Sequence, residues 1–92
     1  MKTPTRRNLP KLLETYRAIE QYRKHNIGGF PSTRDLVKVG IAGSPSVVKY
    51  YFEGMEEMNM MVYVRKIARS SYLLPLDHAH PAIRKLLETE GK

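Results

Sequence analysis

The stretch GSPSVVKYY, from Gly43 to Tyr51, brings hydroxyl, ammonium and phenol groups together within two turns of a predicted helix. Ser44 is a favoured N-cap residue and Pro45 suits the first helical position, so the helix is expected to begin here. The free amides and the positive dipole end of a helix attract phosphate and other anions. These residue types indicate recognition of an anionic partner.

Helical spacing divides this segment into an inward and an outward face. Val48, Phe52 and Met55 recur at steps of four and three residues, so they are predicted to face the core. The opposite face and its border consist of Ser46, Val47, Lys49, Tyr50 and Glu53. An exposed tyrosine beside a lysine is unusual on a plain solvent face. A solvated face with capping serines is the alternative.

A second group of candidate residues is basic. Two segments rich in β-forming residues, Met60–Val64 and Ser70–Leu74, flank a short connection. We predict a β-hairpin, and its tip carries Arg65, Lys66 and Arg69. Such a tip can contact a phosphate backbone and add affinity without sequence information. A merely solvated turn is the alternative.

Other chemistries are poorly represented in the sequence. The chain has no cysteine, which excludes disulfides, thiolate ligands and cysteine nucleophiles. His78 and His80 lack a third ligand at a suitable spacing, so no metal site is expected. No serine–histidine–acid set and no pair of carboxylates stands out. We therefore expect no enzymatic activity, no cofactor and no small-molecule ligand.

The charge and length are those of one small basic domain. The 92 residues include 16 lysines and arginines against 9 acids, a net charge of +7. This balance favours nucleic acid over a membrane as partner, although charge alone fits a merely basic protein equally well. No apolar run approaches the ~20 residues that span a bilayer, and none follows the basic N-terminus as a signal segment. A cytoplasmic protein is expected.

Two further helices must position the candidate groups. The first is predicted from about Pro10 to the turn residues near Gly28, and its apolar stripe is Leu12, Leu13, Tyr16, Ile19 and Tyr22. The second begins after Ser32 or Thr33, which can cap it, and Gly40 stops it after about two turns. Asn59 is expected to reverse the chain after the third helix. The methionines around that point are predicted to fill the core: Met55, Met58, Met60 and Met61.

The two ends of the chain are predicted to differ from this body. Residues 1–8 are expected to form a flexible basic arm, whose arginines are Arg6 and Arg7. Residues 76–92 form a tail with a short terminal helix, whose apolar stripe is Ile83, Leu86 and Leu87. This stripe either packs back on its own domain or pairs with a second copy.

The order of these elements predicts an α+β, mainly α fold. Residues 9–75 are expected to form a winged helix-turn-helix, with three helices and a β-hairpin wing. In such a fold the third helix fits the major groove and its N-terminal residues reach base edges. The predicted partner is double-stranded DNA.

The segment GGFPSTRDLVKVGIAGSPSVVKYYFEGMEEMNMMVYVRKIARSSYLL resembles the N-terminal DNA-binding domain of LexA-type repressors. The shared features include a glycine–aromatic–proline–x–threonine entry and the Ser-Pro-Ser opening of the third helix. Phe52 and Met55 stand where leucines are usual, and the arginine-containing second wing strand ends in Leu73 and Leu74. The likeness extends from about Leu9 to Leu74.

The resemblance implies a sequence-specific transcriptional regulator or repressor from a bacterium, a phage or another mobile element. By position, the groups of the third helix that would meet DNA are Ser44, Ser46, Val47, Lys49 and Tyr50. Thr33 and Arg34, at the start of the second helix, are expected to contact the backbone. Because one small domain buries little DNA surface, binding by two copies on palindromic DNA is expected.

The sequence also departs from this family. Thr33–Ser44 is about one residue short, and Gly40 falls where leucine is usual. The loop before Phe30 is longer than the family's by about two residues, and Asn59 replaces the usual glycine. Only 18 residues follow Leu74, too few for the family's self-cleaving serine–lysine domain, so no autoproteolytic switch is expected in this polypeptide. Two alternatives stay open: a winged-helix adaptor that binds proteins, and a DNA-binding fragment of a longer self-cleaving repressor.

Overall fold

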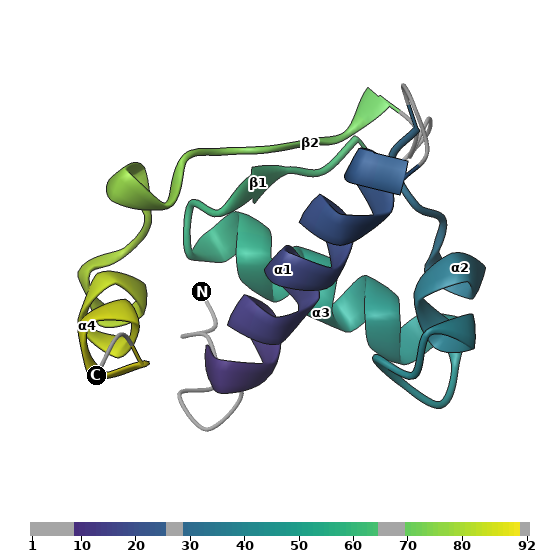
Figure 1. The fold of residues 1–92 in the computed structure, drawn as a ribbon, viewed down its shortest axis with the longest axis horizontal. Coiled ribbons are helices and arrows are strands. Elements are labelled where there is room, and N and C mark those ends of the chain that lie inside the picture. Colours follow the sequence, from purple (N-terminus) through teal and green to yellow (C-terminus); the bar gives the residue numbers. More distant parts are fainter. Residues whose placement is uncertain (1–8, 26–28, 65–69, 91–92) are drawn as a thin grey trace.

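The computed structural model describes residues 9–25, 29–64 and 70–90. The elements within these ranges are α1 (Leu9–His25), α2 (Thr33–Lys38), α3 (Pro45–Glu57), β1 (Met61–Val62), β2 (Tyr72–Leu73), the 3-10 helix η3 (Leu76–His78) and α4 (Pro81–Glu90), as Figure 1 shows. The chain is mainly helical with a small antiparallel sheet, which confirms the α+β, mainly α prediction. No helix among these residues is long and apolar enough to cross a membrane.

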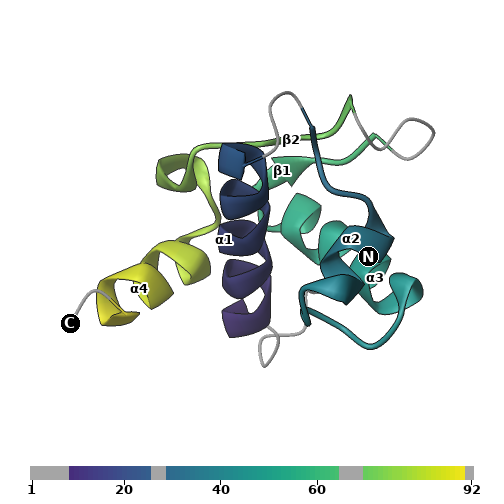
Figure 2. The same ribbon diagram turned by 45° about the vertical axis from the view of Figure 1, so that its right-hand side comes forward.

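The core lies between α1 and α3, which pack across each other (Figures 1 and 2). Four residues of the predicted stripe in α1 are buried, Leu12, Leu13, Tyr16 and Ile19, together with Thr15, whereas Tyr22 at the end of the stripe is only half-buried. A close approach of the two helices explains Gly54 in the middle of α3. A Cβ added there would lie 3.2 Å from the side chain of Leu12, tighter than ordinary packing.

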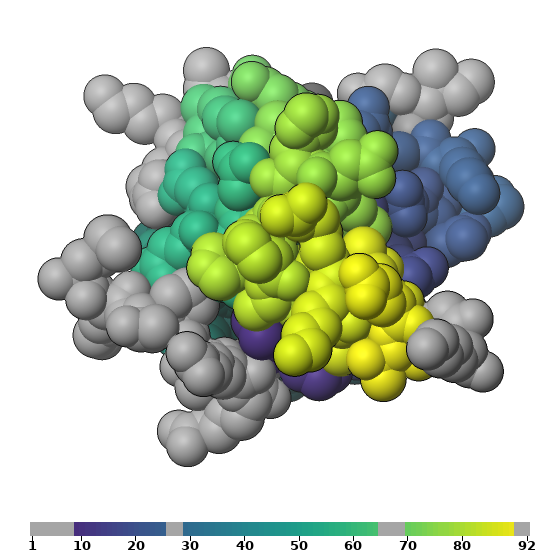
Figure 3. All heavy atoms as spheres, turned by 90° about the vertical axis from the view of Figure 1, so that its left-hand side faces the viewer, coloured from purple at the N-terminus to yellow at the C-terminus, as the bar shows by residue number. Residues whose placement is uncertain are grey.

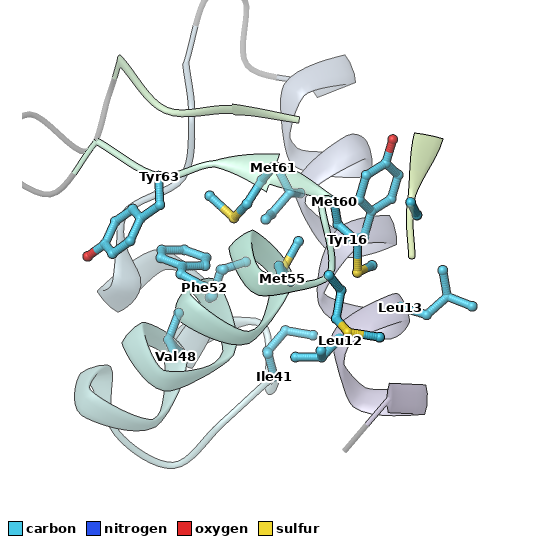
Figure 4. Close-up of a cluster of buried hydrophobic side chains, with 14 of the residues drawn as sticks. Leu12, Leu13, Tyr16, Ile41, Val48, Phe52, Met55, Met60, Met61 and Tyr63 are labelled. Carbon is cyan, nitrogen blue, oxygen red and sulfur yellow. The ribbon is translucent and has the colours of Figure 1, made fainter. Parts of the chain in front are cut away.

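The inward face of α3 is the one that the spacing predicts. Val48, Phe52 and Met55 are fully buried. The ring of Phe52 packs edge-on against Phe30 and Tyr63, with centroid distances of 5.8 and 5.3 Å. Figure 4 shows these side chains pointing from α3 into the cluster beneath the hairpin. This register fixes which side of α3 faces away from the core.

Both α2 and α3 end in the same hydrogen-bonded turn. At α2, Gly40 has φ 90°, its N–H donates to Val37, and the N–H of Ile41 donates to Leu36. At α3, Asn59 has φ 58° and the N–H of Met60 donates to the carbonyl of Met55 at 2.8 Å. In each case a residue in the left-handed region lets two amides satisfy the last carbonyls, and a buried apolar pair seals the turn. The predicted helix ends are confirmed.

The sheet is shorter than the sequence predicts. Among the residues that the structure describes, regular pairing joins only Met61 to Leu73 and Val62 to Tyr72. Beyond these pairs, the N–H of Val64 donates to the hydroxyl of Ser71 at 2.8 Å, so a side chain takes the place of a backbone partner. This side-chain hydrogen bond replaces the next backbone hydrogen bond of the hairpin, so the regular pairing of the two strands ends there. The predicted tip residues Arg65, Lys66 and Arg69, like the arm with Arg6 and Arg7, lie outside the described residues.

The tail packs back on its own domain. Ile83 of α4 is fully buried and Ala79 is nearly so, within the same core as α1 and α3. Leu86 and Leu87 are half-buried against that core. Figure 3 shows α4 covering one side of the molecule, next to α1 and the segment after β2. Ile83 of the stripe thus packs on its own domain, while pairing through the tail with a second copy stays a prediction.

α2 begins with a capping box. The amide N–H of Asp35 donates to the Ser32 hydroxyl at 3.1 Å, and the Asp35 carboxylate accepts the Ser32 amide N–H at 2.9 Å. The hydroxyl of Tyr22 in α1 donates to the same carboxylate at 3.3 Å. The hydrogen bond from the Ser32 amide is the main cause that lowers the pKa of Asp35 below its ordinary value of 3.8.

Asp35→Asn is expected to lower stability at neutral pH but not in acid. The folded-state pKa of Asp35 lies below the unfolded one, so the carboxylate stabilises the fold above pH 3.8 and this contribution is lost as the pH falls through the folded value. Urea unfolding of both proteins from neutral pH down to about pH 2 measures the difference. A difference that stays constant over this range would show that the charge of Asp35 does not support α2.

Candidate nucleic-acid interface

The outward face of α3 presents polar and aromatic side chains to solvent. Ser46, Val47, Lys49 and Tyr50 are all exposed. Val47 and Tyr50 keep 38% and 49% of their surfaces accessible. These four residues lie within two turns of the helix start. The faces are arranged as the spacing predicts.

The start of α3 differs from the start of α2. Ser44 has the extended conformation of an N-cap, but among the described residues its hydroxyl makes no capping hydrogen bond to a first-turn amide. It lies 3.2 Å from the hydroxyl of Ser46 instead. Because Pro45 has no N–H, the first free amides of α3 are those of Ser46 and Val47. These amides, the two hydroxyls and the positive end of the helix dipole all belong to the start of α3, and such a helix start can accept an anionic oxygen.

The two tyrosines in the second turn of α3 are in ring contact with each other. The rings of Tyr50 and Tyr51 are 6.1 Å apart with an angle of 54° between their planes. Tyr51 is half-buried against the core, whereas Tyr50 stays exposed. The packed ring of Tyr51 therefore limits the positions that Tyr50 can take.

The acidic residues of α3 are confined to its second half. Glu53 and Glu56 are half-buried, and Glu57 is exposed in the last turn. Lys49 and the open amides lie in the first half. The helix is therefore electrostatically divided, and only its N-terminal half suits an anion.

The other predicted site residues fall into two groups. Thr33 and Arg34 occupy the first turn of α2, which packs against α3; Thr33 is half-buried and Arg34 exposed. Thr33 and Arg34 therefore lie on a helix that is a direct neighbour of α3. Arg65, Lys66 and Arg69 lie outside the described residues.

Tyr72 is a surface residue that the sequence reading missed. It lies on β2, paired with Val62, and half of its surface is exposed. Ser71 before it is buried, so the side chains alternate across the strand. That alternation is visible in the sequence, and it would have placed Tyr72 on the solvent side of the hairpin.

No family model matches this chain, and no curated protein or solved structure is significantly similar to it. The arrangement of α2, α3 and the hairpin is therefore the basis for a proposed function.

Proposed function

We propose that this chain is a sequence-specific double-stranded DNA-binding protein of winged helix-turn-helix architecture, similar to LexA-type repressors, and that it regulates transcription. The observation that carries the proposal is the outward face of α3. Exposed hydroxyl, ammonium and phenol groups there surround an uncapped helix start. The opposite face, with Val48, Phe52 and Met55, is buried in the core, so the fold leaves the outward face accessible to a partner.

The order of elements supports this use of α3. α2 and α3 are joined by a turn of six residues, and the hairpin follows directly after α3. A helix held in this way fits the major groove, where its N-terminal residues reach base edges. The hairpin then lies beside the helix as a wing, and Arg34 at the start of α2 is suited to the phosphate backbone.

The side chains of α3 match the chemistry of base edges. The ammonium of Lys49 can donate to the O6 and N7 acceptors of guanine, and the hydroxyl of Ser46 can donate or accept. Val47 offers an apolar contact for the methyl group of thymine. The phenol of Tyr50 can combine an apolar contact with a hydrogen bond.

Replacing Lys66 and Arg69 with alanine is expected to weaken binding to every DNA sequence. Their charges are assigned to phosphate, so each lost contact should flatten the slope of log K against log salt by about one unit. Fluorescence anisotropy over a salt series measures the slope. The matched control replaces Arg84 and Lys85, the exposed basic pair of α4, and should keep the wild-type slope. An unchanged slope in the first variant would remove the wing from the interface.

Selection of binding sites from random duplexes at one stated salt concentration tests the proposed function. We expect an enriched motif that appears as an inverted repeat, because one domain of this size covers about 600–1,000 Å² and two copies would combine their energies. Recovery of random sequences alone would contradict sequence-specific binding. It would favour the alternative of an adaptor that binds proteins.

A further inference from the structure

The exposed half of α3 lacks one kind of polar side chain. Residues 44–52 contain two serine hydroxyls, one ammonium and two phenols, but no carboxylate and no side-chain amide. The carboxylates of the helix start at Glu53, which is half-buried. The side-chain amide of Asn59, after the helix, donates to the carbonyl of His78 at 2.6 Å. The part of α3 that is proposed to meet DNA is therefore without strong acceptors.

Strong acceptors are what two of the four bases require in the major groove. Cytosine presents only the N4 amino donor there, which aspartate and glutamate accept. Adenine presents the N6 donor beside the N7 acceptor, a pair that asparagine and glutamine read. Guanine presents two acceptors, O6 and N7, and thymine presents the O4 acceptor and a methyl group. The side chains of α3 therefore suit guanine and thymine.

Lys49 distinguishes between the two purines. Its ammonium has three donor hydrogens and no acceptor, so O6 and N7 of guanine both satisfy it, whereas the N6 amino group of adenine would oppose it with a second donor. The side chain is exposed, and among the residues that the structure describes it makes no ion pair. Its charge is therefore available to a partner.

Val47 distinguishes between the two pyrimidines. Its exposed side chain gains from an apolar contact and cannot hydrogen-bond to N4 or O4. Tyr50 lies three positions further along, so the two side chains are neighbours on the helix surface. The ring of Tyr50 is in contact with Tyr51, with centroids 6.1 Å apart. Val47 and this ring form an apolar pair on which the methyl group of thymine can pack.

The two discriminating residues lie at opposite borders of the outward face. At 3.6 residues per turn, Val47 and Lys49 are separated by more than half a turn, and Ser46 and Tyr50 lie between them. They therefore meet different bases, and a change in one contact should leave the other intact.

We propose that α3 recognises its half-site through the keto bases: a guanine through O6 and N7 by Lys49, and a thymine through its methyl group by Val47 with the ring of Tyr50. The inference rests on the proposed function and deepens it, since it names the chemical groups that make a duplex a target. The hydroxyls of Ser46 and Tyr50 donate and accept equally well, so they do not set this preference.

The thymine contact is tested with the duplex recovered by site selection, in which deoxyuridine replaces one thymidine at a time. Uracil keeps the O4 acceptor and loses only the methyl group. At one position of the half-site we expect the wild-type affinity to fall about fourfold, as for the burial of one methyl group. Val47→Ala should bind both duplexes equally. Val39→Ala is the matched control, because it makes the same change at an exposed valine outside α3, and it should keep the wild-type ratio.

The guanine contact is tested in the same duplex with 7-deazaguanine, which has a C–H group in place of the N7 acceptor. At one guanine the wild-type affinity should fall about tenfold, because a hydrogen bond from a charged donor is lost. Lys49→Met removes the donors at an exposed position and should bind both duplexes equally while it keeps the thymine–uracil ratio. Replacing each adenine with 7-deazaadenine should leave the affinity unchanged.

The possible failures of this inference are distinct from failure of the proposed function. An enriched motif that tolerates uracil at every thymine would overturn the role of Val47, and one that tolerates 7-deazaguanine at every guanine would overturn that of Lys49. A Lys49→Met variant with a flatter salt slope but the wild-type guanine ratio would assign Lys49 to phosphate instead. The absence of any enriched motif would contradict sequence-specific binding, and this inference with it.

Discussion

Replacing Phe52 with alanine is expected to lower the free energy of unfolding by about 3–5 kcal/mol. The side chain is fully buried, and its ring touches Phe30 and Tyr63 edge-on. Its removal leaves a cavity between α3 and the hairpin that the surrounding helices can close only in part. Urea unfolding followed by circular dichroism measures the change as a lower midpoint at an unchanged slope.

Tyr50→Ala is the matched control for Phe52→Ala, since it truncates an aromatic residue two positions earlier on the same helix. Tyr50 is half-exposed, so its effect on the free energy of unfolding should stay within about 0.5 kcal/mol. An unfolded Tyr50→Ala variant beside a stable Phe52→Ala variant would show that the assigned faces of α3 are reversed.

Replacing Ile83 with alanine is expected to cost about 2–5 kcal/mol, because this residue fixes α4 to the core. The loop before α4 is also bonded to the end of α3. The side-chain Nδ2 of Asn59 donates to the carbonyl of His78 at 2.6 Å, and the backbone N–H of His80 donates to the carbonyl of Met58 at 2.8 Å. A chain that ends at Leu76 should therefore be less stable. Urea midpoints of both variants check this.

Lys85→Ala is the control for Ile83→Ala, since it changes an exposed position of the same helix and should leave stability nearly unchanged. Sedimentation of the full chain and of the chain ending at Leu76 separates stability from assembly. We expect no change in oligomeric state. Full stability without α4, or a dimer that depends on it, would contradict the packing of the tail.

The features predicted correctly from the sequence are mainly local ones. The burial of Val48 and Phe52 follows from spacing along one helix, and the turns at Gly40 and Asn59 follow from residues that tolerate positive φ. The cap at Ser32 is local as well. Each of these depends on neighbours within a few residues, so the sequence alone determines it.

The features that the sequence left open or missed depend on contacts between distant segments. The burial of Ile83 requires α4 to meet α1, and η3 is positioned by the end of α3. The early end of the sheet comes from the hydroxyl of Ser71 at Val64. A groove between α1 and α2, next to Val39, exists only because these two helices pack together. Periodicity does not contain this information.

The outward face of α3 is the centre of this account, and its most direct test is a ratio of two affinities. Dissociation constants for a selected duplex and for its base-scrambled counterpart are measured by anisotropy at one salt concentration, for the wild-type chain and for Tyr50→Ala. We expect the wild type to prefer the selected duplex by about 10³-fold or more. Tyr50→Ala should reduce this ratio about tenfold while it keeps the melting temperature and the salt slope. Equal binding of both duplexes by the wild type, or an unchanged ratio in Tyr50→Ala, would contradict base recognition by α3.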